Sequence, residues 1–262
     1  MSMSDRFAAA GLYFDIEETI MPTEPTTKNC IAFVDAQALF HAARQAFGCF
    51  YPDYDPVALC KLLCEQQGWD LAQVRVYTSI PPLDENEHWH RFWMNKLRSL
   101  EHAGAFTWWR PWRFRRRPVK LPDGQTQMLM TAIEKGVDMR IAIDVITRAH
   151  SKSYDVALVF SQDQDLAEVA DEIRGIARTQ DRWIKIASAY PYSSASRSFR
   201  GIDRTDWIQV DREIYDKCLD PRDYRPKRVR AHTPEEEAAA ASEERDLDGG
   251  MAEDSRPQDD LD

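Results

Sequence analysis

Short apolar runs alternate with longer segments of helical periodicity through the middle of the chain. Segments 30–34 and 156–160 (CIAFV and VALVF) are uninterrupted apolar runs, which are typical of strands covered on both faces. Segment 55–67 has helical spacing and meets the stop signal Gly68. The same criteria predict strands at 74–78, 106–112, 183–187 and 207–210, and helices at 37–47, 86–102, 134–150, 166–178 and 212–218. This alternation predicts an α/β fold with a mostly parallel central sheet between two helical layers.

Charge divides the chain into a neutral body and an acidic tail. The net charge of the 262 residues is −10, and residues 232–262 alone hold 12 Asp and Glu against 2 Arg. The stretch PRDYRPKRVR just before them is basic. Neither end of the chain has enough apolar residues to form a core. We therefore expect a flexible N-terminal arm at 1–28, a folded domain at 29–220, and a disordered tail at 221–262 that is basic and then acidic.

Composition argues against a membrane protein and against a disulfide scaffold. Hydrophobic residues make up 43% of the chain, but no apolar run approaches the roughly 20 residues that span a bilayer. The N-terminus lacks the basic-then-apolar order of a signal peptide. The five cysteines are odd in number and form no second pair at zinc-ligand spacing, which favours buried structural thiols. We expect a cytoplasmic protein without a membrane partner, and the sequence leaves a homo-oligomer open.

Three aspartates occur where strands end or a helix starts. Asp35 ends CIAFV, Asp163 follows VALVF, and Asp138 lies in the first turn of helix 134–150, where the helix dipole favours an anion. Ligand sites in parallel sheets form beyond the carboxyl ends of the strands, so we expect these carboxylates at one edge. Each aspartate alone is more typical of a helix cap. Together they would repel one another without a cation, and oxygen-only ligands suit Mg²⁺ or Mn²⁺.

Two further aspartates belong to the same stretches. Asp165 lies two residues beyond Asp163 and is predicted to support the metal site. Asp144 lies six residues beyond Asp138, roughly 120° around a helix. It therefore either faces elsewhere or supports the metal ligands indirectly.

Segment 105–120 (AFTWWRPWRFRRRPVK) combines arginines with aromatic rings and contains no acidic residue. Basic side chains neutralise phosphates and rings stack on unpaired bases, so the segment favours contact with nucleic acid. The alternative is a strand whose rings lie in the core and whose arginines are solvated. Lys135 offers a phosphate contact beside Asp138, and Ser161 offers a cap or a phosphate contact. The predicted nucleic-acid-binding residues are Arg110, Arg113, Arg115, Arg116, Arg117, Lys120, Lys135 and Ser161.

Three blocks of this sequence, IAFVDAQALF, EKGVDMRIAIDVI and YDVALVFSQDQDLAEVADEI, resemble the signature blocks of NYN-domain proteins. This is the branch of the PIN-like nucleases that includes the LabA-type proteins. The resemblance covers roughly residues 29–212 and ends in SASRSFRGIDRTDWIQVD. The family's first aspartate matches Asp35, its Lys-Gly-Val-Asp matches 135–138, and its second acidic motif matches 161–165. The family's usual Asn is replaced by Ala38, and a glycine of the acidic motif by Gln162.

The resemblance implies a PIN-like three-layer α/β/α fold and RNA cleavage that depends on a divalent metal. The first hypothesis is an endoribonuclease with catalytic residues Asp35, Asp138, Asp163 and Asp165, of which the first three bind Mg²⁺ or Mn²⁺. The second is an RNA-binding or regulatory module that has lost catalysis, which Ala38 favours and the retained aspartates oppose. A small phosphohydrolase ranks last, because Asp35 is not followed by a second aspartate at the spacing of an Asp-x-Asp nucleophile motif.

Overall fold

In the described part of the chain, six parallel strands form the central sheet: β1 (Asn29–Asp35), β2 (Asp70–Ile80), β3 (Phe106–Pro111), β6 (Val156–Phe160), β7 (Lys185–Pro191) and β8 (Asp206–Val210). Their order is β3-β2-β1-β6-β7-β8. The computed structural model describes residues 22–120, 126–133, 136–196 and 199–226, with backbone only for 117, 119–120 and 129–133. The predicted parallel sheet is confirmed.

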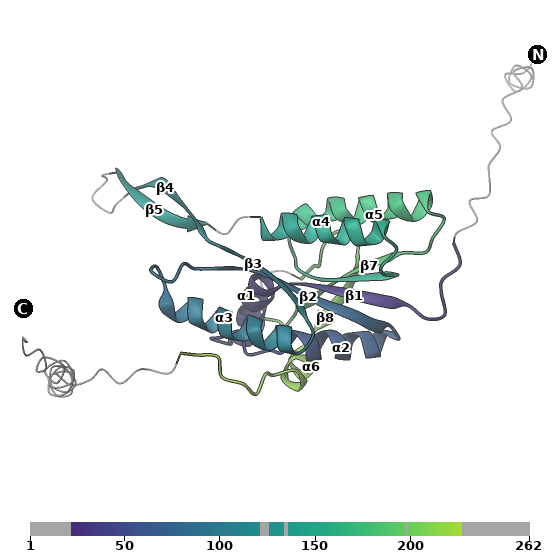
Figure 1. The fold of residues 1–262 in the computed structure, drawn as a ribbon, viewed down its shortest axis with the longest axis horizontal. Helices are drawn as coiled ribbons and strands as arrows, with labels where there is room; N and C mark the ends of the chain where they lie inside the picture. Colours follow the sequence, from purple (N-terminus) through teal and green to yellow (C-terminus); the bar gives the residue numbers. More distant parts are fainter. Residues whose placement is uncertain (1–21, 121–125, 134–135, 197–198, 227–262) are drawn as a thin grey trace, which may run out of the picture. The chain divides into compact units, whose positions relative to one another are not determined.

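Helices cover both faces of this sheet (Figure 1). One layer contains α1 (Ala36–Phe47), α2 (Pro56–Gln67), α3 (Glu87–His102) and α6 (Arg212–Lys217), and the other contains α4 (Val137–His150) and α5 (Ala167–Thr179). Strand β1 alternates between them, since Ala32 and Val34 pack toward α1–α3 whereas Ile31 and Phe33 pack toward α4 and α5. The predicted three-layer fold is confirmed.

The order of the strands creates a switch point between β1 and β6. The chain runs outward from β1 through β2 to β3, and then outward in the opposite direction from β6 through β7 to β8. Val34 pairs with Phe160, so Asp35 and Ser161 directly follow this pair at one edge of the sheet. Open α/β sheets bind ligands in the crevice beyond such a point. The fold therefore brings both strand-end motifs to the edge where a site is expected.

A hairpin of β4 (Arg113–Lys120) and β5 (Thr126–Ile133) follows β3 and was not predicted. It projects beyond the end of the sheet in Figure 1. Trp112 marks the change of direction, and its backbone N–H donates to the carbonyl of Ile80 at 3.0 Å. The Asp-Gly pair between the two strands is a strong hairpin signal. It was missed because neither flanking segment shows a clean alternation of apolar and polar residues.

Both ends of the described chain pack onto the domain. Lys28 accepts a backbone hydrogen bond from Asp70 at 2.9 Å, and Tyr224 is buried against Phe92. The C-terminal segment covers Lys96, which is 1% exposed and donates to the Tyr54 carbonyl at 2.6 Å. Burial lowers the pKa of Lys96 to about 8. Residues 1–21 of the predicted arm and 227–262 of the predicted tail lie outside the described residues.

Two further expectations concern the cysteines and the membrane. All five cysteines are free thiols, and Cys60 and Cys64 are buried in the core. Among the helices of the described part of the chain, none has the length and apolar character needed to cross a bilayer.

Candidate metal centre and nucleic-acid interface

Three carboxylates converge beyond the end of β6. Asp138, Asp163 and Asp165 each place one carboxylate oxygen within 4.8 Å of the other two. Asp163 and Asp165 are exposed, and Asp138 is half-buried. Three like charges at this separation repel one another, and a divalent cation between them would offset the repulsion. Asp165, which was expected only to support the site, belongs to this group.

Asp35 lies at the same edge but outside the group of three. Its Oδ1 accepts the backbone N–H groups of Gln37 at 3.1 Å and Ala38 at 2.9 Å, and thereby caps α1. With Asp163 it lines a cavity of about 140 Å³. A metal-binding role for Asp35 stays a prediction.

A tight turn holds Asp163 and Asp165 in place. The buried Oγ of Ser161 accepts the backbone N–H of Asp163 at 3.1 Å, and Asp163 Oδ1 accepts that of Asp165 at 3.0 Å. Ser161 therefore shapes the turn. Because capping uses one of the two carboxylate oxygens of Asp163, the cap and a bound cation are compatible.

Two glutamines that were not predicted as site residues clamp this turn onto a neighbouring loop. Gln162 Nε2 donates to the carbonyl of Arg200 at 2.9 Å. Gln164 Nε2 donates to the carbonyl of Gly201 at 3.0 Å, and its Oε1 accepts the N–H of Asp203 at 3.1 Å. The partners are more than 35 residues away in the sequence, so no local pattern reveals these bonds. These hydrogen bonds therefore attach the turn of Asp163 and Asp165 to the loop at residues 200–203.

The third carboxylate enters from the start of α4. Gly136 caps this helix with a positive φ of 84°, which glycine adopts without strain. A Cβ at this position would lie 2.7 Å from Nη1 of Arg110. The absence of a side chain thus lets Arg110 pack on the helix terminus that carries Asp138. Lys135, the other predicted phosphate contact here, lies outside the described residues.

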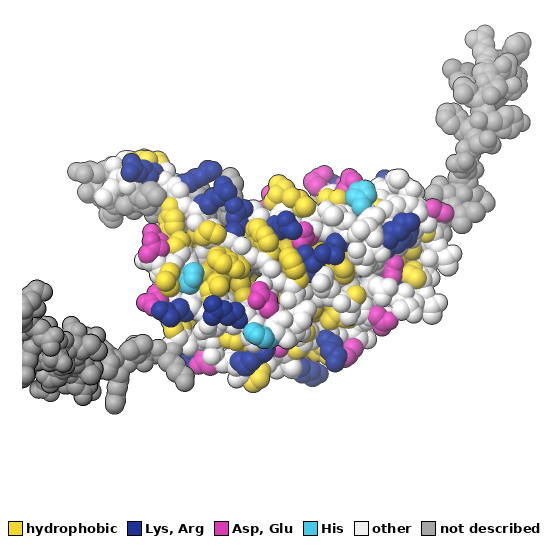
Figure 2. All heavy atoms as spheres, in the orientation of Figure 1, with side chains coloured by type: hydrophobic (Ala, Val, Ile, Leu, Met, Phe, Trp, Pro, Cys, Tyr) yellow, Lys and Arg dark blue, Asp and Glu magenta, His cyan; other side chains and the backbone are white. Residues whose placement is uncertain are grey.

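The hairpin carries the rest of the predicted basic surface. Arg113, Arg115 and Arg116 are exposed, and among the described residues they form no ion pair with an acidic side chain. Figure 2 shows Lys and Arg side chains gathered over the hairpin, beside hydrophobic side chains. Trp109 is 40% exposed. The side chains of the predicted contacts Arg117 and Lys120 are not described.

The alternative prediction for segment 105–120, that its aromatic rings lie in the core, is also met in part. Phe106 and Trp108 are half-buried and pack against the core beneath α4 and α5. The guanidinium groups of Arg110 and Arg140 each lie 5.9 Å from the ring centre of Trp108. Strand β3 therefore places some rings in the core and leaves Trp109 at the surface.

Comparison with known families settles the class of protein. The family model of the NYN domain matches residues 30–180, more than half of the chain. This chain belongs to the NYN-domain family. The resemblance predicted from the three sequence blocks is confirmed, whereas membership of the LabA-type branch stays a prediction. The three layers and the parallel sheet agree with a PIN-like fold.

Other comparisons add little to this assignment. No match was found among curated proteins. A Vibrio parahaemolyticus protein of unknown function is 15% identical, with a TM-score of 0.42 over 75% of this chain and 99% of its own. MurG of Acinetobacter baumannii is 12% identical, with a TM-score of 0.27 over 69% of this chain and 45% of its own. At such scores neither structure informs the function.

Asp144 of this NYN domain faces away from the acidic cluster. Its carboxylate accepts hydrogen bonds from Arg75 at 2.8 Å and from the Tyr77 hydroxyl at 2.7 Å, and pairs with Arg140 at 2.9 Å. Burial alone would raise the pKa of Asp144, but the bonds from Tyr77 and Arg75 outweigh it and hold that pKa below its ordinary value. Asp144 thus fastens α4, the helix of Asp138, to β2.

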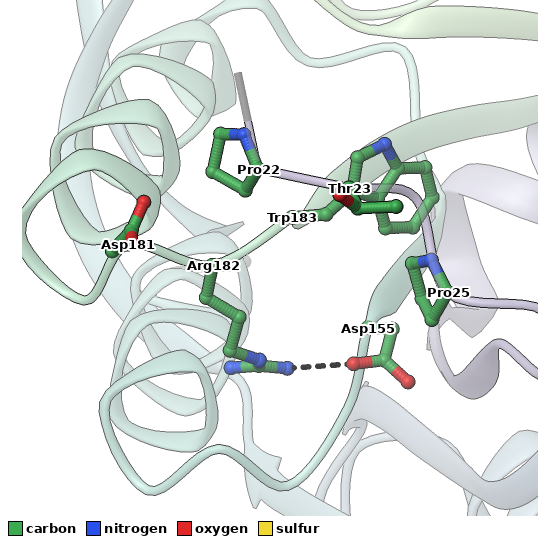
Figure 3. A pocket seen from close by; sticks show the side chains of 7 residues that line it. All are labelled: Pro22, Thr23, Pro25, Asp155, Asp181, Arg182 and Trp183. Carbon is green, nitrogen blue, oxygen red and sulfur yellow. Dashed lines mark hydrogen bonds and ion pairs between the residues drawn. The ribbon is translucent and has the colours of Figure 1, made fainter. Parts of the chain in front are cut away.

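A cavity of about 400 Å³ lies at the opposite edge of the sheet, near the starts of β6 and β7. Figure 3 shows Arg182 pointing toward Asp155, and their ion pair measures 3.1 Å. Pro22, Thr23 and Trp183 form other parts of the wall. The predicted catalytic residues lie beyond the carboxyl ends of the strands, so we assign this cavity no part in the candidate site.

Proposed function

We propose that this NYN-domain protein is an endoribonuclease that depends on Mg²⁺ or Mn²⁺. The observation that carries the proposal is the convergence of Asp138, Asp163 and Asp165 within 4.8 Å at the switch-point edge of the sheet. Family membership supports a nuclease-like domain. The exposed arginines of the β4–β5 hairpin support RNA as the partner.

The donor set fits a hard divalent cation. All three donors are carboxylate oxygens, and two of the three side chains are exposed to solvent. Asp138, Asp163 and Asp165 would hold the cation, and Asp35 would join them from the end of β1. When bound, the cation would supply Lewis-acid activation of water and of the scissile phosphate.

The remaining residues position the site and the substrate. Ser161 is 4% exposed and its hydroxyl accepts the N–H of Asp163, so it orders the turn and is not available as a nucleophile. Arg110 of β3, which packs against the N-terminus of α4, would bind a phosphate next to Asp138. Farther from the cleaved bond, Trp109 would stack on RNA bases and the hairpin arginines would bind RNA phosphates.

Purified protein should cleave labelled single-stranded or structured RNA in Mn²⁺ or Mg²⁺, and EDTA should stop the reaction. Binding without cleavage in either metal would favour the second candidate, a non-catalytic RNA-binding module. Ala38 is the observation behind that candidate, because the family usually has Asn at this position. Failure to cleave and to bind RNA would contradict both.

We further expect the acidic tail to compete with RNA. Residues 232–262 carry a charge of −10, and membership of the same chain would give them a high effective concentration toward the hairpin arginines. Deleting them should tighten RNA binding at low salt, and the difference should shrink at high salt because ions screen the tail. Binding isotherms at two salt concentrations measure the effect.

The matched control for this deletion keeps the length of the tail and removes its charge. In it, ten of the 12 Asp and Glu of residues 232–262 become Asn and Gln, so that the two that remain balance the 2 Arg. This protein should bind RNA as tightly as the truncated one. Equal affinity of full-length and truncated protein at low salt would leave the tail only a solubilising role.

A further inference from the structure

The cavity beside the acidic cluster has a polar end and an apolar wall. Its volume is about 140 Å³. Asp35, Ser161 and Asp163 line the polar end. The apolar wall combines three alanines with four larger side chains, namely Ala38, Ala42, Ala189, Leu39, Phe160, Tyr190 and Pro191. Asp163 therefore belongs both to this cavity and to the group of three carboxylates.

Alanines keep the cavity open. Ala38 and Ala42 are one helical turn apart, so they lie on the same face of α1, and both are half-exposed at the opening. Ala38 stands where the NYN family usually has Asn, so the departure from the family pattern widens the space beside Asp35. The interior wall is fixed, because Phe160 and Ala189 are at most 1% exposed and lie in two neighbouring strands of the sheet, β6 and β7.

We propose that this cavity binds the base of the RNA nucleotide next to the cleaved phosphate. The inference rests on the proposed ribonuclease function and names a specificity site within it. The volume is close to the roughly 150 Å³ of a protein cavity that binds benzene, which is room for a planar ring. A nucleobase has apolar faces for the apolar wall and polar edges for Ser161 and Gln162, which also lines the cavity. The phosphate attached to that nucleotide then lies toward the carboxylates.

Filling the cavity tests this inference. Ala38→Leu and Ala42→Leu place a larger apolar side chain in it, and Ala46→Leu is the control, because Ala46 is a half-buried residue of α1 outside the lining. Each protein is incubated with random-sequence RNA and Mn²⁺, and the bases flanking each cut are sequenced. We expect the wild type and Ala46→Leu to share a preference at one flanking position. Both filled variants should lose that preference and about tenfold in kcat/KM, the scale of one lost base contact.

Two readouts separate this inference from the nuclease proposal. The Mn²⁺ concentration for half-maximal activity should be the same in all four proteins, since the carboxylates are untouched. If Ala38→Leu and Ala42→Leu cleave with the wild-type base preference, the cavity is not a base site. That result would not contradict the nuclease proposal.

If the wild type does not cleave RNA, the nuclease proposal is wrong. Nucleotide binding then tests whether the cavity is a base site. Saturation-transfer NMR with the four 5′-mononucleotides should then show binding to the wild type and to Ala46→Leu, and its loss in Ala38→Leu and Ala42→Leu. Equal signals in all four proteins, or no signal in the wild type, would overturn the inference.

Discussion

Replacing Asp163 by Asn should abolish RNA cleavage while leaving the fold intact. The amide keeps the shape of the carboxylate, and its oxygen can still accept the N–H of Asp165, a bond of 3.0 Å in the wild type. It removes the charge that would hold a cation among the three aspartates. We expect kcat to fall by roughly 100-fold or more, as when one electrostatic contact to a transition state is removed. Single-turnover cleavage in Mn²⁺ measures this, with circular dichroism to verify the fold.

Asp84→Asn is the matched control for this change. Asp84 is exposed, lies outside the acidic cluster, and undergoes the same chemical substitution. It should leave cleavage unchanged. If Asp163→Asn cleaves at the wild-type rate, a mechanism that depends on these carboxylates is wrong.

Replacing Asp144 by Asn should destabilise the fold much more than the same replacement at Asp138 on the same helix. Arg75, the partner of Asp144, has a side chain only 3% exposed and would lose its charged partner inside the protein. Removing one member of a buried pair typically costs about 3 kcal/mol or more. Urea unfolding at pH 7 measures the cost. Asp138→Asn on the same helix is the control, and it should not destabilise the fold because it relieves repulsion in the acidic cluster.

The cost of Asp144→Asn should depend on pH. The pKa of Asp144 in the folded protein lies below its ordinary value, so its contribution is complete above the unfolded-state pKa and is lost as the pH falls through the folded-state pKa. The difference between wild type and variant should therefore shrink below about pH 4. A difference that stays constant from pH 7 to pH 3 would mean that Asp144 acts through packing and not through its charge.

The sequence predicted the layers of the fold because buried strands leave a strong local signal. The runs that became β1 and β6 are apolar throughout, and both are buried strands at the centre of the sheet. The β4–β5 hairpin escaped prediction because arginines interrupt one strand and the other mixes polar residues with methionines.

The candidate site was predictable at the level of motifs and less so at the level of atoms. The strand-end rule led to Asp163 and, through the helix start, to Asp138. It could not rank Asp165 above Asp35, because that depends on a turn shaped by Ser161. The position of Asp144 was equally hidden, since its partners Arg75 and Tyr77 lie on a strand more than 65 residues away.

An anomalous difference map of crystals soaked in Mn²⁺ tests most directly whether Asp138, Asp163 and Asp165 hold a divalent cation. We predict a peak about 2 Å from a carboxylate oxygen of each of these aspartates. The same map shows whether Asp35 joins them. No peak at this site, at a Mn²⁺ concentration that saturates any RNA cleavage by the same protein, would mean that these aspartates do not form a cation site.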